Sequence, residues 1–260
     1  MSVLLEAAGL NMHFKGLKAV NDFNAKIEKG SICGLIGTNG AGKTTVINML
    51  SGVLEPTSGK ILFEGKDITG VKPDKIAKMG ITRTYQNLRL FKKMTVLENV
   101  LMGAQMHDNL DPLGIVLNSK NFNKREQDLR DKSMEMLKVM GIDEYAQSLS
   151  GALPYGSQRK LEIARVLASE PKLLLLDEPA AGMNPAESAE LTEIIREIRD
   201  RFSLTILLIE HDMKVVMGLC EYIYCMAFGE IISQGLPEDV RSDPHVIEAY
   251  LGRGAVDAQN

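Results

Sequence analysis

The stretch Gly37–Thr44 has the residue types and spacing of a phosphate-binding site. Its eight residues match the P-loop pattern G-x-x-x-x-G-K-[ST]. In such a loop, backbone N–H groups surround a phosphate, the lysine reaches the terminal phosphates and the final hydroxyl binds Mg²⁺. We therefore expect Lys43 to bind the β- and γ-phosphates of a nucleotide and Thr44 to be a Mg²⁺ ligand. The alternative is a glycine-rich turn that carries a surface lysine.

Two acidic residues follow a strongly apolar run later in the chain. Leu173–Leu176 is a run of four leucines, and Asp177 and Glu178 come directly after it. In P-loop enzymes an aspartate at such a strand end holds Mg²⁺ or its bound water. A carboxylate beside the metal can orient the attacking water and accept its proton. These residues predict a metal-binding role for Asp177 and a catalytic role for Glu178, with a solvated turn as the alternative.

Three other side chains are candidates whose roles the residues alone leave open. His211 is either a contact to the γ-phosphate or a turn residue before a helix capped by Asp212. Gln86 either coordinates the metal or lies exposed in a loop. Phe14 lies in a polar, glycine-containing stretch and either stacks on an adenine or packs in the core.

An α/β sheet is needed to bring these residues together. The apolar segment Ile32–Ile36 predicts a buried strand before the P-loop, and residues 45–50 have helical spacing after it. The four leucines are typical of a central parallel strand that is buried on both faces. Because open α/β sheets bind ligands at the carboxyl ends of their strands, we expect the P-loop, the acidic pair and His211 to meet there.

Hydrophobic periodicity predicts the remaining elements of a single domain, 1–260. Residues 88–155 have the pattern of a helical subdomain inserted in the core, and residues 236–260 that of a short helical extension. The stretch 107–122 is long for a structureless loop and predicts a short helix or a functional excursion. The patterns predict short strands within 3–36 and at 59–63, 80–85 and 204–209, a strand pair at 222–234, and helices at 73–79, 95–106, 123–139, 157–169, 185–202, 213–220, 237–242 and 244–251.

Composition excludes several classes of protein. The net charge of −4 argues against a general surface for nucleic acid or anionic membranes. The sequence has no apolar run of about 20 residues and no signal-peptide pattern, so we expect an intracellular, soluble chain that meets membranes through a partner. Three cysteines without metal-ligand spacing predict packed, reduced thiols, namely Cys33, Cys220 and Cys225.

The order of these motifs resembles the ATP-binding subunits of ABC transporters over nearly the whole chain. The resemblance implies a P-loop NTPase fold with a RecA-like parallel core, an N-terminal antiparallel β subdomain and an inserted α-helical subdomain. It also implies catalytic roles for Glu178, His211 and Gln86. The nucleotide-binding residues that it implies are Phe14, Val20, Thr38, Asn39, Gly40, Ala41, Gly42, Lys43, Thr44 and Thr45, and the metal ligands are Thr44, Gln86 and Asp177.

The signature motif departs from the form that is usual in this family. The usual motif is Leu-Ser-Gly-Gly-Gln, and it completes the ATP site of an opposing subunit. This chain has Leu153, Pro154, Tyr155, Gly156 and Ser157 in its place. Pro154 removes the serine hydroxyl, whereas Gly156 and the following helix N-terminus keep backbone donors for a phosphate. The departure is compatible with a pair of two different ATPase chains, and a homodimer stays open.

Finer features resemble the importers of branched-chain amino acids. The ATPase of lipopolysaccharide transport has a similar layout and is one alternative, and a soluble ABC ATPase or a P-loop kinase is another. The resemblance implies ATP and Mg²⁺, a second ATPase subunit, two transmembrane permease subunits, a substrate-binding protein, no nucleic acid, and a peripheral position on the cytoplasmic face of the membrane. The segments that carry it are 16–20, 87–91, 178–185, 210–213 and 246–252.

Overall fold

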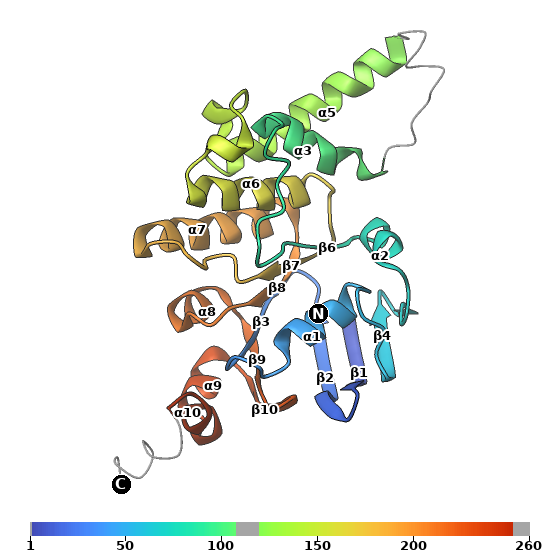
Figure 1. Ribbon diagram of the computed structural model, residues 1–260, viewed down its shortest axis with the longest axis vertical. Helices are drawn as coiled ribbons and strands as arrows, with labels where there is room; N and C mark the ends of the chain where they lie inside the picture. The colour runs from blue at the N-terminus through green and yellow to red at the C-terminus, as the bar shows by residue number, and fades with distance from the viewer. Residues whose placement is uncertain (1, 108–119, 252–260) are drawn as a thin grey trace.

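The computed structural model describes residues 2–107 and 120–251 of the chain (Figure 1). The helix or excursion expected within 107–122 falls mainly outside these ranges, and so does the tail from Gly252. Among the described helices, none is long and apolar enough to cross a membrane.

The N-terminal part of the chain forms an antiparallel sheet in the order β2-β1-β4-β5. The expectation of short strands in this region is wrong, because β1 and β2 each contain twelve residues and are joined at Lys15–Gly16. Several register shifts between β1 and β2 change the phase of the alternation and hide the two long strands in the sequence. The strands are β1 (Val3–Phe14), β2 (Leu17–Glu28), β4 (Ser58–Phe63) and β5 (Lys66–Asp67).

A second, six-stranded sheet forms the centre of the molecule in the order β10-β9-β3-β8-β7-β6. Its strands pair in parallel except for β10, which is antiparallel to β9. The carboxyl ends of the parallel strands therefore lie at one edge. The strands are β3 (Ile32–Gly37), β6 (Ile81–Arg83), β7 (Leu173–Asp177), β8 (Thr205–Ile209), β9 (Tyr222–Ala227) and β10 (Glu230–Gly235).

The central strands are buried on both faces, as the leucine run predicts. Leu174 and Leu176 belong to one hydrophobic cluster, whereas Leu173 and Leu175 belong to the other. Neighbouring side chains in a strand point to opposite faces, so this one strand contributes to both cores. The rigidity of β7 then fixes the position of the acidic pair at its end.

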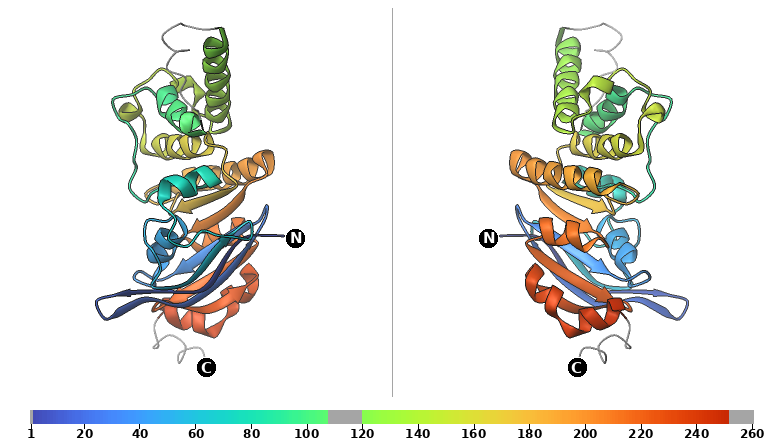
Figure 2. Two further views of the ribbon diagram at one scale, coloured as in Figure 1. Left: turned by 90° about the vertical axis from the view of Figure 1, so that its right-hand side faces the viewer. Right: turned by 90° about the vertical axis from the view of Figure 1, so that its left-hand side faces the viewer.

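Helices surround this sheet, and α3, α5 and α6 gather at the end of the molecule farthest from α9 and α10 (Figure 1, Figure 2). Capping boxes start two helices, at Thr95 with Glu98 and at Asn184 with Glu187. The division at 88–155 and 236–260 stays a prediction. The helices are α1 (Lys43–Leu50), α2 (Pro73–Met79), α3 (Val96–Ala104), α5 (Lys120–Val139), α6 (Tyr155–Leu167), α7 (Pro185–Phe202), α8 (Met213–Leu219), α9 (Pro237–Ser242) and α10 (Pro244–Leu251), with 3₁₀ turns at Gln105–His107, Asp143–Tyr145 and Ser150–Ala152.

Candidate functional site

Two glycines allow neighbouring strands to pack directly on the backbone of the P-loop. A Cβ atom at Gly37 would lie 2.2 Å from the carbonyl oxygen of Met226 on β9. A Cβ atom at Gly42 would lie 2.6 Å from the carbonyl oxygen of Ala19 on β2. Both glycines also have positive φ angles, which other residues rarely adopt. The loop is therefore held from two sides by backbone contacts that side chains would block.

The ammonium group of Lys43 lies inside this loop. Its Nζ donates hydrogen bonds to the carbonyl oxygens of Gly37, at 2.6 Å, and Thr38, at 3.0 Å. Burial lowers the pKa of Lys43, while the nearby charge of Glu178 acts in the opposite direction. A cation that is held by loop carbonyls is positioned to exchange one of them for a phosphate oxygen.

The start of α1 supplies further donors for an anion. The first helical bond runs from the N–H of Val46 to the carbonyl of Gly42, so the N–H groups of Lys43, Thr44 and Thr45 have no acceptor within the helix. These groups and the positive helix end form a ready site for phosphate. Among the other predicted loop residues, Thr44, Asn39 and Gly40 are exposed, Thr38 and Thr45 are half-buried and Ala41 is buried.

Asp177 lies at the end of β7 and is almost fully buried. Its Oδ2 is 3.2 Å from Nη2 of Arg83, and its backbone N–H donates to the hydroxyl of Thr84 at 3.2 Å. Burial raises the pKa of Asp177, and the positive charge of Arg83 opposes that rise. Arg83 is a residue that the sequence analysis did not single out.

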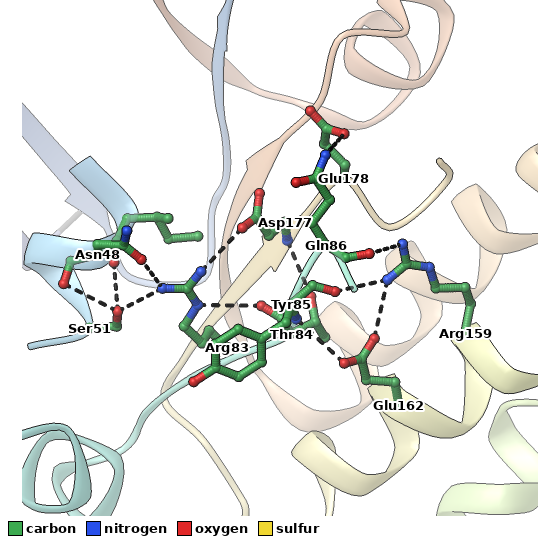
Figure 3. A network of polar contacts seen from close by, with 11 residues as sticks. Asn48, Ser51, Arg83, Thr84, Tyr85, Gln86, Arg159, Glu162, Asp177 and Glu178 are labelled. Carbon is green, nitrogen blue, oxygen red and sulfur yellow. Dashed lines mark hydrogen bonds and ion pairs between the residues drawn. The ribbon is translucent and has the colours of Figure 1, made fainter. Parts of the chain in front are cut away.

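Glu178, Gln86 and His211 meet beside Asp177, although they come from three different segments. Nε2 of Gln86 donates to Oε2 of Glu178 at 3.1 Å (Figure 3). Nδ1 of His211 is 3.8 Å from Oε1 of Glu178. Glu178 has a φ angle of +48°, a conformation that costs free energy in a residue with a side chain and often marks functional sites. Asp212 caps α8, as expected, by accepting from the N–H of Lys214.

Phe14 does not pack in the core, which was one of its two predicted roles. It ends β1 next to the Lys15–Gly16 turn, and 43% of it is exposed. Val20 is fully buried, and its Cγ2 atom would be 3.4 Å from a Cβ atom at Gly42. Val20 thus supports the P-loop from β2, whereas Phe14 offers an open aromatic face.

The altered signature motif starts α6, two residues earlier than the predicted helix. Pro154 is the N-cap, and Tyr155 is the first helical residue. The hydroxyl of Tyr155 donates to the carbonyl of Ala181 at 3.0 Å and accepts from Nε of Arg159 at 3.2 Å. Of the other motif residues, Leu153 and Gly156 are buried and Ser157 is half-buried. The tyrosine that replaces the usual glycine therefore ties the signature to the segment after Glu178.

Arg159 is a second residue that the sequence analysis did not single out. Its guanidinium donates to the carbonyls of Tyr85, at 2.9 Å, and Gln86, at 2.6 Å, and it pairs with Glu162 (Figure 3). The arginine and glutamate side chains are 3% and 1% exposed. The i,i+3 spacing of Arg159 and Glu162 is visible in the sequence, whereas the burial of the pair is not.

The predicted metal ligands have the chemistry that Mg²⁺ requires. Thr44, Gln86 and Asp177 offer hydroxyl, amide and carboxylate oxygens, and Mg²⁺ is typically bound by one or two protein carboxylates together with phosphates and water. The described residues contain no group of three histidine, cysteine or acidic side chains that suits a metal held by protein alone. The buried carboxylate of Asp177 lies near the phosphate cradle, by which we mean the P-loop Gly37–Thr44 and the N–H groups that begin α1. It therefore fits a metal that arrives with a nucleotide.

Comparisons with known proteins match two parts of the chain to described families. The ABC transporter family matches residues 20–181, and a family described as branched-chain amino acid ATP-binding cassette transporter matches residues 230–256. The chain is 44% identical over 249 residues to the high-affinity branched-chain amino acid transport ATP-binding protein BraF of Pseudomonas aeruginosa, covering 96% of this chain and 98% of that protein. It is 45% identical, with the same coverage, to LivG of Escherichia coli K12, which has the same description. Among solved structures, the ADP conformation of MJ1267, an ATP-binding cassette of an ABC transporter, is 32% identical, covers 97% of this chain and 100% of its own, and has a TM-score of 0.85.

Proposed function

The chain belongs to the family of ABC transporter ATP-binding proteins, and on this basis we propose that it drives the import of branched-chain amino acids. It is an ATP-binding protein and an ATP hydrolase of the ABC type. The observation that carries the substrate class is the match of residues 230–256 to the branched-chain family, together with two near full-length relatives named for that transport.

The geometry supports hydrolysis by a water molecule activated at Glu178. Its carboxylate lies beside Asp177 and within reach of Gln86 and His211, so it can orient water and accept a proton. Lys43 and the N–H groups that begin α1 bind the phosphates, and Mg²⁺, when bound through Thr44, Asp177 and Gln86, neutralises their charge. In this scheme His211 contacts the γ-phosphate, and Phe14 stacks on the adenine.

A second ATPase subunit completes each ATP site in this proposal. The signature of one chain faces the P-loop of the other, and the γ-phosphate adds contacts that exist only in the closed pair. Pro154 offers no hydroxyl, so the contribution of this chain comes from the N–H groups at the start of α6, around Gly156. Closure follows ATP binding, and hydrolysis followed by loss of the γ-phosphate opens the pair.

A groove beside β6 supports docking to a membrane subunit. It has a volume of about 680 Å³ and lies between β6, α2, α3 and α6. Phe91 is 47% exposed and lines this groove, whereas Leu90 packs against the helical core. We assign the groove to a loop of a permease, and the proposal includes a peripheral position of the chain at the cytoplasmic face of the membrane. Residues that line it include Arg83, Tyr85, Arg89, Phe91, Met102 and Arg165.

Reconstitution with its partners tests this function. The chain would be combined in vesicles with a second ATPase subunit, two permease subunits and a substrate-binding protein, and ATP hydrolysis would be measured as amino acids are added. We expect leucine, isoleucine or valine to stimulate hydrolysis and to accumulate inside the vesicles. Stimulation by lipopolysaccharide instead, or hydrolysis that needs no membrane partner, would contradict the proposal.

A further inference from the structure

One arginine, Arg83, joins the P-loop helix to the carboxylate at the end of β7. Its Nη2 contacts Oδ2 of Asp177 at 3.2 Å. Its Nη1 donates to Oδ1 of Asn48, at 2.7 Å, and to the hydroxyl of Ser51, at 3.1 Å, both of which follow from the P-loop along the chain (Figure 3). Three segments that are distant in the sequence therefore meet at one guanidinium group.

The arrangement leaves Arg83 little freedom. Its side chain is 8% exposed and that of Asp177 is 7% exposed, so both lie largely out of water. Nε also points to the backbone carbonyl of Thr84 at 3.4 Å, and the guanidinium carbon is 4.6 Å from the centre of the Tyr85 ring. A planar group with donors engaged on several sides is fixed in orientation as well as in position.

The contact determines which oxygen of Asp177 is available. Arg83 engages Oδ2, and the other carboxylate oxygen points away from the guanidinium (Figure 3). Groups that orient a ligand carboxylate set the strength of metal binding, even though they never touch the metal. In addition, Asn48 belongs to the helix that begins with Lys43 and Thr44. Arg83 thus links the helix that follows the P-loop directly to Asp177, in addition to the sheet that carries both.

We propose that Arg83 is a positioning residue that holds Asp177 in register with the P-loop helix, so that its free oxygen is presented to a Mg²⁺–nucleotide. This inference rests on the proposed metal role of Asp177. Lysine at this position keeps the charge but lacks the fork that reaches Asp177 and Asn48 together. Glutamine at position 83 lacks both the charge and the fork.

The test compares nucleotide affinity with and without the metal. A fluorescent, non-hydrolysable ATP analogue is titrated into the full chain in excess Mg²⁺ and again in EDTA, and the ratio of the two Kd values measures the contribution of the metal. For Arg83→Gln we expect that contribution to fall about tenfold, with the Kd in EDTA unchanged, because loss of such a partner typically weakens metal binding 10–100-fold. The ratio for Arg83→Lys should lie between the ratios of the wild type and of Arg83→Gln. Asn48→Ala, which keeps the ion pair but removes the shorter of the two hydrogen bonds from Nη1 to the α1 segment, should move the ratio in the same direction and by less.

The controls separate this inference from the proposed function. Arg196→Gln removes an exposed arginine that pairs with Glu193, far from this site in the chain, and should leave the ratio unchanged. Asp177→Asn should abolish the metal contribution, and a wild-type ratio in that variant would contradict the metal role of Asp177 itself. If Asp177→Asn behaves as expected but Arg83→Gln keeps the wild-type ratio, or loses affinity equally in Mg²⁺ and EDTA, the positioning role is wrong. If Arg83→Gln does not fold, the ratio for Asn48→Ala decides, and a wild-type value overturns the proposal.

Discussion

The side-chain amide of Gln86 donates a hydrogen bond to the carboxylate of Glu178 across 3.1 Å. Gln86 follows β6 and Glu178 follows β7, and these two strands are neighbours in the central sheet. The bond occupies Oε2 of Glu178, one of the two oxygens that are able to accept a proton from water. The second oxygen, Oε1, is not engaged by Gln86, so it is the one available to accept a proton from water while Gln86 orients the carboxylate through Oε2. In this way the segment after β6 and the hydrolytic residue depend on each other.

Replacing Phe14 tests the adenine contact. Phe14 is 43% exposed, so Phe14→Ala should leave the Tm almost unchanged. If the ring stacks on adenine, the variant should lose about 1–3 kcal/mol of ATP affinity, which is roughly a 5- to 150-fold rise in Kd. Leu17→Ala is the matched control, because Leu17 lies on the same hairpin and is even more exposed. Equal affinities for the two variants, measured by nucleotide titration, would rule out stacking.

Replacing Gly37 tests the close packing under the P-loop. Gly37→Ala places a methyl group 2.2 Å from the carbonyl oxygen of Met226, a distance at which the backbone must shift. We expect a loss of about 1–3 kcal/mol of stability, or more, because overpacking forces backbone shifts of that kind. Gly30→Ala is the control: Gly30 also has a positive φ angle but has open space at its Cβ position. Denaturant unfolding should show the larger loss for Gly37→Ala, and the reverse order would contradict the packing described here.

The pH dependence of stability should report the buried carboxylate of Glu210. It accepts hydrogen bonds from the N–H groups of Ala180, at 3.0 Å, and His211, at 3.1 Å. Burial raises the pKa of Glu210 above its ordinary value of 4.5, so the folded state binds more protons than the unfolded state just above that pH. Its contribution to stability therefore falls as the pH rises from 4.5 through the folded pKa.

Glu210→Gln removes this titration and isolates its effect. The Tm of the variant minus that of the wild type should become more positive between about pH 4 and pH 7, whatever its constant offset from lost hydrogen bonds. Calorimetry at several pH values provides the measurement, and a falling difference for Glu210→Gln would mean that the sign is wrong.

The groove beside β6 predicts which surface residues matter for assembly. Phe91→Ala removes a half-exposed ring and should change the Tm very little. We expect it to weaken retention of the subunit on detergent-purified permeases several-fold, because exposed aromatic anchors dominate many interfaces. Leu149→Ala, which is 53% exposed and outside the lining of the groove, should be retained like the wild type. If both variants bind the permeases equally, the docking assignment is wrong.

Local patterns were sufficient for the elements whose signals are short and continuous. The P-loop, the leucine strand β7 and the helices α2 and α7 follow from spacing and from residues such as Pro185, and the helix bounds agree with the structure. The lengths of β1 and β2 did not follow, because the register shifts between them break the period that identifies a strand. The alternation of apolar and polar residues identifies a strand reliably only where the pairing between strands has a regular register.

Partnerships between distant segments were outside the reach of these patterns. Arg83 looked like a polar residue in a short strand, and its side-chain partners lie in α1, at the C-cap of α1 and in β7. Arg159 likewise looked like one of several charged residues after the signature. Its partners, the carbonyls of Tyr85 and Gln86, are backbone atoms, which leave no mark in the sequence. Sequence predicted which residues do chemistry, whereas the structure was needed to find those that hold them in place.

The most direct test of the account is the turnover of Glu178→Gln. Glutamine keeps the size and the hydrogen bond to Gln86 but cannot accept a proton, so hydrolysis should fall at least about 10²-fold while ATP affinity is retained. Size-exclusion chromatography in ATP should show the variant trapped in a closed pair with its ATPase partner, and Glu193→Gln should behave as the wild type. A Glu178→Gln protein that hydrolyses ATP at the normal rate would show that the catalytic residue is not Glu178.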